Sequence, residues 1–461
     1  MKNKKRFRAL CLLACALPLW GADGSEQQKP APLSVSIGDA TLTPFGFVDA
    51  TLFGRSTNVG SGIGTNFAGI PFDSAASHLS EMNFSAQNSR AGFRVDSTVG
   101  GAKVLGYFEA DFLGSAPGNV LVTSNSNTFR MRNYFVDLRK GKVEFLAGQD
   151  WSLATPNRNG LSPLPSDLFY TQNMDTNYQA GLVWSRQAQF RFTWHPNANF
   201  AVALSLENPQ QYLGGSGGLT SSAVKLPSAL ASVGSQFNNG ATGSAVPNLH
   251  PDIIVKAAWD AHPGGRHLHL EAVSLTRSFK DAFLAGASGS YRTSSLTAES
   301  GEVNANFEFS KNFRLIANTF FGAGNGRYLF GMAPDVIVRA DGTLSPIHSY
   351  STVDGFEANI LKNILLYGYY GGIAIARNTA LDTNGQAIGY GYSGSSNGAN
   401  RTIQEATLGV TPTIWKSVNS GALSLIVQYS WVTRAPWYVA AGAPRNAHTN
   451  MYWLDLRYTI P

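Results

Sequence analysis

From residue 41 onward, the connections between strand-like segments of this chain alternate strictly between short and long. The seven short connections are residues 99–102, 140–141, 195–199, 261–266, 311–312, 362–363 and 416–421. The eight long ones are residues 54–82, 113–128, 150–186, 208–251, 280–300, 323–351, 378–401 and 434–449. Antiparallel strands joined in this way place every long connection at one end of the sheet, which is the layout of a membrane β-barrel. Sandwiches and propellers have no physical reason to sort their connections by length.

Sixteen segments lie between these connections, and they follow the period-2 alternation of apolar and polar side chains that a half-buried β-strand gives. They are residues 42–53, 83–97, 103–112, 129–139, 142–149, 187–194, 200–207, 252–260, 267–279, 301–310, 313–322, 352–361, 364–377, 402–415, 422–433 and 450–460. In segment 83–97, Phe93 and Val95 fall on one face, while Arg90 and Arg94 fall on the other. A strand with one face in lipid and the other in water explains this split. The predicted fold class is therefore all-β, a transmembrane antiparallel β-barrel of about sixteen strands.

Composition favours the same class. Charged residues make up only 14% of the chain and aromatic residues 11%, with 48 glycines, whereas charged residues average about 25% in soluble proteins. After the N-terminal region, no segment approaches the continuous apolar stretch of about 18 residues that suggests a spanning helix. Because only helices and closed barrels satisfy the backbone inside lipid, low charge without such a stretch favours a barrel.

The N-terminus predicts export. Five basic side chains and no acidic one occur within the first eight residues, and an apolar run follows at residues 9–20. This is the pattern of a secretory signal peptide that is cleaved after a short apolar region. We therefore predict a signal peptide at residues 1–22, a short periplasmic leader at residues 23–40 and a single barrel domain at residues 41–461.

Removal of that signal changes what charge and cysteine content imply. The chain has 35 basic and 29 acidic residues, and without the five basic residues of the signal it has 30 against 29, a net charge of about +1. The sequence pI of 9.2 therefore reflects the signal and does not indicate a nucleic-acid partner. Both cysteines, Cys11 and Cys15, also lie in the signal, so the exported chain has no disulfide, cysteine nucleophile or thiolate metal site.

Three stretches resemble a known protein family. Residues 88–94, Asn-Ser-Arg-Ala-Gly-Phe-Arg, are similar to the wall segment of trimeric general porins from which an arginine projects into the pore. Residues 145–152, Phe-Leu-Ala-Gly-Gln-Asp-Trp-Ser, and residues 173–179, Asn-Met-Asp-Thr-Asn-Tyr-Gln, resemble the DcaP-like branch of that superfamily. The resemblance covers most of residues 41–191, and the remainder matches only as a barrel pattern.

This resemblance implies a homotrimer in the outer membrane of a Gram-negative-type bacterium, surrounded by outer-membrane lipid. Each barrel would form a water-filled channel for diffusion of small polar solutes, with a preference for anions or dicarboxylates. The resemblance also implies that the third external loop folds into the lumen. Residues 150–186 would be that loop, with Arg158, Asp167 and Asp175 as candidate pore-lining charges.

Strand parity adds candidates on the barrel wall. Arg90 and Arg94 lie on the wet face by parity and also match the porin resemblance. Glu109 and Asp111 on the neighbouring strand supply the opposite sign, which predicts a transverse electric field across the lumen of the kind that sets ion selectivity. Arg191 has inward parity as well.

Three other residues complete the wall predictions. Gln149, within the DcaP-like stretch, is a further pore-lining candidate. Arg130 and Arg132 share the parity of Tyr134 on the presumed outward face, so we do not count them as lumen residues.

No catalytic constellation is evident. His262, His267 and His269 are metal-ligand types, but a His-x-His pair beside a Pro-Gly-Gly turn is a weak metal signal, so plain polar lumen residues are the preferred interpretation. No Gly-x-Ser-x-Gly or His-Glu-x-x-His motif is present. The sequence therefore predicts no cofactor, no metal and no enzymatic activity. Two alternatives stay open: an exported β-rich hydrolase or carbohydrate-binding protein, and a barrel that acts as an adhesin.

Overall fold

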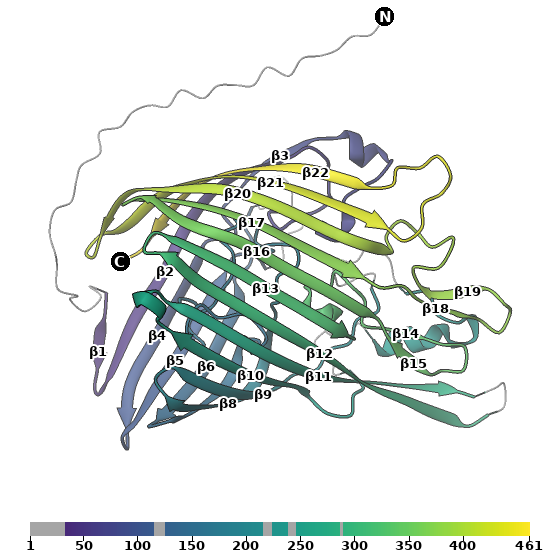
Figure 1. The fold of residues 1–461 in the computed structure, drawn as a ribbon, viewed down its shortest axis with the longest axis horizontal. Coiled ribbons are helices and arrows are strands. Elements are labelled where there is room, and N and C mark those ends of the chain that lie inside the picture. Colours follow the sequence, from purple (N-terminus) through teal and green to yellow (C-terminus); the bar gives the residue numbers. More distant parts are fainter. Residues whose placement is uncertain (1–32, 115–124, 215–223, 238–245, 286–288) are drawn as a thin grey trace, which may run out of the picture.

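A single antiparallel sheet closes on itself into a barrel (Figure 1). The computed structural model describes residues 33–114, 125–214, 224–237, 246–285 and 289–461. β2 (Ala40–Arg55) closes the barrel, because it pairs with β22 (Ala447–Thr459) on one side and with β3 (Glu81–Ser85) and β4 (Arg90–Val99) on the other. β3 and β4 together make one interrupted wall strand. The wall therefore has sixteen strands, and the predicted fold class is confirmed.

Between β4 and β22 the wall strands follow one another in chain order, each antiparallel to the next. They are β5 (Ala102–Asp111), β6 (Arg130–Lys140), β7 (Val143–Trp151), β8 (Arg186–Asn197), β9 (Phe200–Glu207), β10 (Asp252–Ala261), β11 (Leu268–Leu284), β12 (Tyr291–Ser310), β13 (Phe313–Ala323), β16 (His348–Leu361), β17 (Ile364–Ile375), β20 (Asn400–Ser417) and β21 (Gly421–Pro436). β2 begins, and β22 ends, at the edge of the barrel where the short turns lie. We call this edge the turn end and the opposite edge, which carries the long loops, the loop end.

Smaller elements accompany the wall. β1 (Val35–Ile37) pairs with the start of β2, so the last residues of the predicted leader join the sheet. Residues 1–32, with the predicted signal peptide, lie outside the described residues. The loops contain the hairpins β14 (Val336–Val338) with β15 (Leu344–Pro346), and β18 (Asn378–Leu381) with β19 (Ala387–Tyr390). Short 3-10 helices are η1 (Phe67–Gly69), η2 (Ala75–His78), η3 (Ser228–Gln236), η5 (Pro263–Gly265) and η6 (Gly326–Tyr328).

Two predicted segments differ from the observed strands. Residues 86–89 interrupt the predicted strand 83–97, although both halves pair with β2. The predicted loop 280–300 is largely strand, because β11 and β12 stay paired as far as Leu284 and Tyr291. Beyond the lipid both faces of such a hairpin lie in water, so its sequence carries no apolar and polar alternation to reveal it.

The wall sorts its side chains by face. Outward residues include many exposed apolar and aromatic side chains, such as Phe93, Phe190, Val303 and Leu454. Exposed aromatic residues gather towards the turn end at Trp194, Trp259, Phe309 and Trp415, and towards the loop end at Phe321, Tyr350, Tyr429 and Tyr452. Aromatic belts at two levels are typical of the two membrane interfaces. No helix among the described residues is long and apolar enough to cross a membrane.

The loop-end half of the barrel interior is filled by protein. A large cluster of buried apolar side chains joins loop residues such as Phe67, Met174 and Val336 to inward wall residues such as Ile254 and Trp453. Because this packing is continuous, long loops from several parts of the chain share one core with the inner wall. Only part of the lumen is therefore left open to water.

Candidate functional site

The third loop, L3, comprises residues 152–185 between β7 and β8 and crosses the barrel interior. Its N-terminal part touches the wall at β9 and β11, where Glu207 accepts a 2.8 Å hydrogen bond from the backbone N–H of Leu153, and Glu271 accepts one of 3.1 Å from that of Asn157. The predicted inward fold of the third loop is therefore confirmed.

Two more wall glutamates hold the rest of L3. Arg158 forms a bidentate ion pair with Glu357 of β16, with N–O distances of 2.6 and 2.8 Å. Glu405 of β20 accepts hydrogen bonds of 2.8 Å from the Ala180 backbone N–H and 2.9 Å from the Asn173 side chain. Charge-assisted hydrogen bonds are stronger than neutral ones. L3 is thus tied to carboxylates on four wall strands, a role that the sequence did not reveal.

On the β4–β6 side, L3 faces a set of arginines instead. Arg130 binds Asp111 through two hydrogen bonds of 2.7 and 2.9 Å. Arg132 hydrogen-bonds both to Glu109 and to Asp111, the latter at 2.7 Å. Arg90 lies 3.8 Å from Glu109. The predicted transverse field between Arg90 and these carboxylates is therefore wrong: adjacent strands bring the side chains within ion-pairing distance on the same wall.

The inward positions of Arg130 and Arg132 correct the prediction made from parity. The pairing of β5 with β6 shifts register at this point, since Glu109 pairs with Asn133 but Ala110 pairs with Met131. Arg132 is the extra residue of a β-bulge, which reverses the parity of the residues before it. Met131 consequently faces outward at 40% exposure, while Arg132 is only 2% exposed.

Tyr178 of L3 connects the loop to these arginines. Its hydroxyl lies 3.4 Å from an Arg90 nitrogen and 3.3 Å from an Arg132 nitrogen. Burial alone would raise the pKa of the Tyr178 phenol, but the positive charges of Arg90 and Arg132 outweigh burial and lower it. Tyr178 also has a left-handed backbone with φ of 59°, a conformation that costs an aromatic residue about 1–2 kcal/mol. The loop thus accepts strain to hold this side chain against the cations.

Between this contact and the loop end of the barrel lies a cavity of about 260 Å³, which we call the loop-end cavity. Arg130, Arg132 and Arg186 line it together with Tyr178 and Trp184. The guanidinium of Arg186 lies 5.2 Å from the ring of Trp151, and its Nη1 atom is buried without a hydrogen-bond partner, as is Nε1 of Trp184. Buried donors that lack an acceptor are costly, so this cavity offers unused hydrogen-bond donors. We call Arg90, Arg130, Arg132 and Arg186 the arginine cluster.

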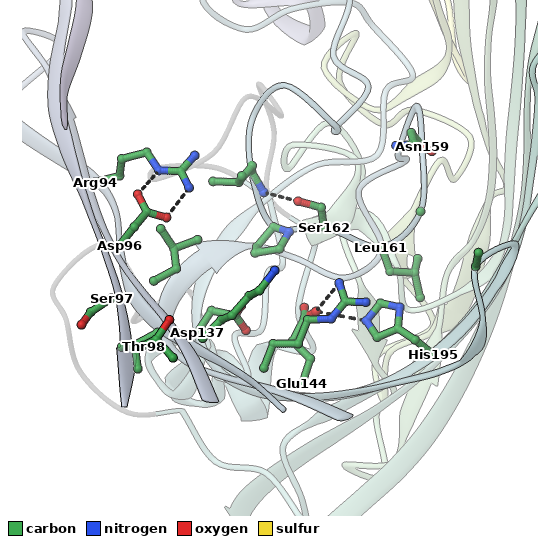
Figure 2. Close-up of a pocket in the computed structure, with 18 of the residues that line it drawn as sticks. Arg94, Asp96, Ser97, Thr98, Asp137, Glu144, Asn159, Leu161, Ser162 and His195 are labelled. Atoms are coloured by element: carbon green, nitrogen blue, oxygen red, sulfur yellow. Dashed lines mark hydrogen bonds and ion pairs between the residues drawn. The ribbon is translucent and has the colours of Figure 1, made fainter. Parts of the chain in front are cut away.

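On the other side of L3 lies the turn-end cavity, of about 910 Å³ (Figure 2). Arg94 lies in it and is bound to Asp96, with an Nε–Oδ2 distance of 2.7 Å. L3 residues from Asn159 to Leu164 reach into the same cavity. The opposite side of the cavity carries Glu144, which pairs with His195 at 3.0 Å. Arg94 therefore faces the lumen, as parity predicts, but in its wide part.

The remaining predicted site residues fall in different surroundings. Asp167 is half-buried on L3, where its backbone carbonyl accepts a hydrogen bond from Arg158 N–H. Asp175 is only 1% exposed, and its carboxylate accepts hydrogen bonds from the backbone of Thr65 and Asn177. Its carboxylate therefore fixes L3 against the first loop and does not face open water.

Two wall candidates also lie away from the cavities. Arg191 faces inward but is 3% exposed, with its guanidinium bound to the Trp151 carbonyl at 2.7 Å. Gln149 lies on the outward face, since it pairs with Tyr134, whose hydroxyl is 3.3 Å from its side-chain oxygen. Its prediction as a lumen residue is wrong, because the alternation in β7 puts it with outward Phe145.

The histidines are held by hydrogen bonds within the wall. His267 Nε2 and His269 Nδ1 both lie 2.8 Å from the same oxygen of Asp260. Another oxygen of Asp260 accepts a hydrogen bond from the L3 residue Gly160. Over the part of the chain that the structure describes, no group of three or more metal-ligand side chains is placed to hold an ion.

The geometry defines a class: a sixteen-stranded antiparallel barrel narrowed by an inward third loop. Its fold is that of the outer-membrane channel DcaP of Acinetobacter baumannii, with a TM-score of 0.65 at 17% identity over 92% of this chain and 99% of that one. The predicted DcaP-like resemblance is thus confirmed at the level of fold.

Other comparisons are weaker. Pseudomonas putida OprB aligns with a TM-score of 0.48 at 9% identity over 90% of this chain and 94% of that one. OmpT of Vibrio cholerae aligns with a TM-score of 0.47 at 11% identity over 92% and 99%. Comparison with protein-family models found no match, and neither did comparison with curated protein sequences.

Proposed function

We propose that this chain is an outer-membrane porin, a water-filled channel through which small polar solutes diffuse, and not an enzyme. The supporting observation is the arrangement of two lined cavities on either side of L3, with polar and charged side chains between them. The loops fill much of the loop-end interior with apolar side chains, and the loop-end cavity lies on the β4–β6 side of that interior. Solutes would then pass between L3 and the arginine cluster.

We propose further that the channel favours anions, including dicarboxylates. Four arginines of the arginine cluster face two carboxylates, Glu109 and Asp111, which gives a local net charge of 4 − 2 = +2. The buried donors Arg186 Nη1 and Trp184 Nε1 lack acceptors, and a carboxylate could fill that role. Rings of charge at a constriction set the sign of the permeating ion.

Conductance across a planar bilayer tests both statements. The purified folded protein is expected to give stepwise ion currents and a reversal potential of anion-selective sign under a KCl gradient. Added succinate should reduce the chloride current more than acetate does, because two carboxylates can engage two arginines. A folded protein without conductance would contradict the channel and leave the adhesin as the better interpretation, while a cation-selective current would contradict only the anion preference.

Export and assembly complete the proposal. Cleavage of residues 1–22 would deliver the chain to the periplasm, and the folded barrels would associate as homotrimers. Support for a contact face comes from an open groove on the outer side of β2 and β3, where Val48 and Phe84 are 58% and 73% exposed. Light scattering of the detergent-solubilised protein measures the mass, and a monomer would contradict the assembly. A detergent-independent protein in the soluble periplasmic fraction would instead favour the exported hydrolase or carbohydrate-binding alternative.

A further inference from the structure

Lysine is concentrated at one end of the barrel. Of the nine lysines after residue 33, six lie in or within two residues of the short turns at the turn end. These six are all exposed, and we call them the lysine ring: Lys103, Lys140, Lys142, Lys311, Lys362 and Lys416. Lys103 also lines the turn-end cavity, so the other five are the members that can reach lipid. The basic side chains of the constriction are arginines instead. Lysine and arginine therefore occupy different parts of the barrel, the exposed turn end and the constriction.

No opposite charge balances the lysine ring within the turns. The seven turns contain no aspartate or glutamate, and no member of the ring forms an ion pair among the residues that the structure describes. The acidic residues nearest in the wall are already paired with other groups: Glu144 and Asp260 with histidines, Asp96 with Arg94 and Glu308 with Arg314. Asp39, in the turn between β1 and β2, adds one exposed acidic side chain to the rim, so the rim presents a net excess of positive charge.

The height of these lysines relative to the aromatic belt indicates what they face. Lys416 follows outward Trp415 directly, Lys311 lies two residues beyond outward Phe309, and Lys142 adjoins Val143, which pairs with outward Trp194. Aromatic belts mark the level of the lipid headgroups. With a rise of about 3.3 Å per residue, the lysine ring lies at or just beyond the phosphates, within reach of a flexible lysine side chain.

We propose that the lysine ring binds the phosphate groups of anionic phospholipids in the membrane leaflet at the turn end. Lysine suits this task because its ammonium is a compact, hydrated charge on a flexible stem that can follow a mobile lipid. The distribution around the circumference also fits lipid, which surrounds a barrel, better than a cell-wall polymer, which would lie across the end of the barrel.

Two of the lysines also brace the rim. Lys140 donates to the carbonyl of Gly100 at 3.2 Å, and Lys142 donates to that of Pro196 at 2.7 Å, each in a neighbouring turn. Within the described structure, Lys311, Lys362 and Lys416 donate no side-chain hydrogen bond. These three can be changed without removing a contact, so they form the variant of choice if the sixfold change impairs folding.

The test measures lipid preference at the barrel surface. Wild type is reconstituted in phosphatidylcholine vesicles with trace spin-labelled phosphatidylglycerol or phosphatidylcholine, and the association constants of the two boundary lipids are compared by electron paramagnetic resonance. A lipid beside one lysine should be favoured about fivefold near physiological salt, and the average over the boundary about twofold. Changing all six lysines to glutamine, or only Lys311, Lys362 and Lys416, should lower that preference, as should 1 M salt.

The matched control removes the same number of basic residues at the loop end. It carries glutamine at Lys280, Arg292, Arg339, Arg377, Arg401 and Arg445, and it should keep most of the preference. An unchanged preference in the folded lysine variants would overturn the proposal, as would an equal loss in the control. Binding of detergent-solubilised protein to purified peptidoglycan provides the rival outcome: lysine-dependent retention there, without lysine-dependent lipid preference, would assign the ring to the cell wall and overturn lipid binding.

Discussion

Changing Arg90 to glutamine is expected to reduce the anion preference of the channel about threefold, because one unit charge is lost beside the ion path, whereas the same change at Arg94 should have little effect. Arg90 lies where L3 meets the wall, 3.4 Å from the Tyr178 hydroxyl, and its side chain is 12% exposed. Arg94 lies in the wide turn-end cavity and is neutralised by Asp96 through two hydrogen bonds. The sequence assigns both arginines the same role, and the geometry separates them.

The magnitude comes from Coulomb's law. An ion that passes about 6 Å from one unit charge in water interacts with it by about 0.7 kcal/mol, and a Debye length of about 8 Å reduces this to about 0.3 kcal/mol. Loss of the charge affects anions and cations in opposite directions, so their permeability ratio changes by about 0.65 kcal/mol, or about threefold. For Arg94 the adjacent carboxylate cancels most of the field, and the expected change is below about twofold.

The assay is the reversal potential of each purified variant in planar bilayers under a tenfold KCl gradient. Both variants should fold, because each new side chain stays in a wet lumen. Glu109 keeps its ion pair with Arg132 when Arg90 is changed. An unchanged reversal potential for Arg90→Gln, or an equal shift for Arg94→Gln, would refute the placement of the constriction between L3 and the arginine cluster.

Three further changes test other parts of the structure. Phe108→Arg should destabilise the folded barrel in vesicles by about 2–4 kcal/mol if the site is near the bilayer midplane, because Phe108 stacks on outward Phe93 at 4.9 Å; unchanged urea unfolding would place it away from lipid. Glu357→Gln removes the charged partner of buried Arg158, at a cost of up to about 3–5 kcal/mol, and should loosen L3 and increase the noise of single-channel currents. Current noise in the variant equal to that of the wild-type channel would argue against this anchor. Gln149→Ala should leave conductance and reversal potential as in wild type, since Gln149 faces outward. A shift in either quantity would indicate that Gln149 lines the lumen.

Strand parity was the most reliable guide to the wall. It identified sixteen strands and placed Arg90, Arg94 and Arg191 on the inner face, where the structure has them. The lipid and water faces of a barrel strand repeat every two residues, so this information is local and survives without knowledge of the fold. The prediction for Gln149 failed because it came from a motif and ignored the parity of its own strand, which groups it with Phe145.

Parity fails at a β-bulge. One additional residue at Arg132 turns Arg130 and Arg132 inward, against the alternation of Tyr134 and the residues after it. Whether a strand accommodates an extra residue depends on its neighbour's register, which the strand's own sequence does not contain. A useful signal was nevertheless present. Simple alternation would place both arginines against lipid, which costs several kcal/mol. A shift in strand register that turns them inward is therefore the better interpretation.

The wall carboxylates that anchor L3 could not be predicted from the sequence, for a different reason. Inward glutamates such as Glu207, Glu271, Glu357 and Glu405 satisfy the parity rule, but nothing local distinguishes a carboxylate that faces water from one that accepts a loop N–H. That distinction depends on the path of L3 through the lumen, fixed by contacts more than 50 residues apart along the chain. Long-range contacts of this kind leave no period in the sequence.

These contacts give the acidic and the basic side chains of the inner wall different roles. Where L3 meets β9, β11, β16 and β20, wall carboxylates accept hydrogen bonds from its N–H groups or pair with Arg158. These carboxylates therefore hold the loop in place. Where L3 meets β4–β6, the wall supplies cations in excess of carboxylates, and the loop offers the phenol of Tyr178. A carboxylate belt on one side fixes the loop, and the opposite side keeps a net positive charge. On the proposed function, the same loop placement that narrows the lumen therefore also favours anions, because it engages the carboxylates of the acidic wall as loop anchors and leaves the basic wall facing water.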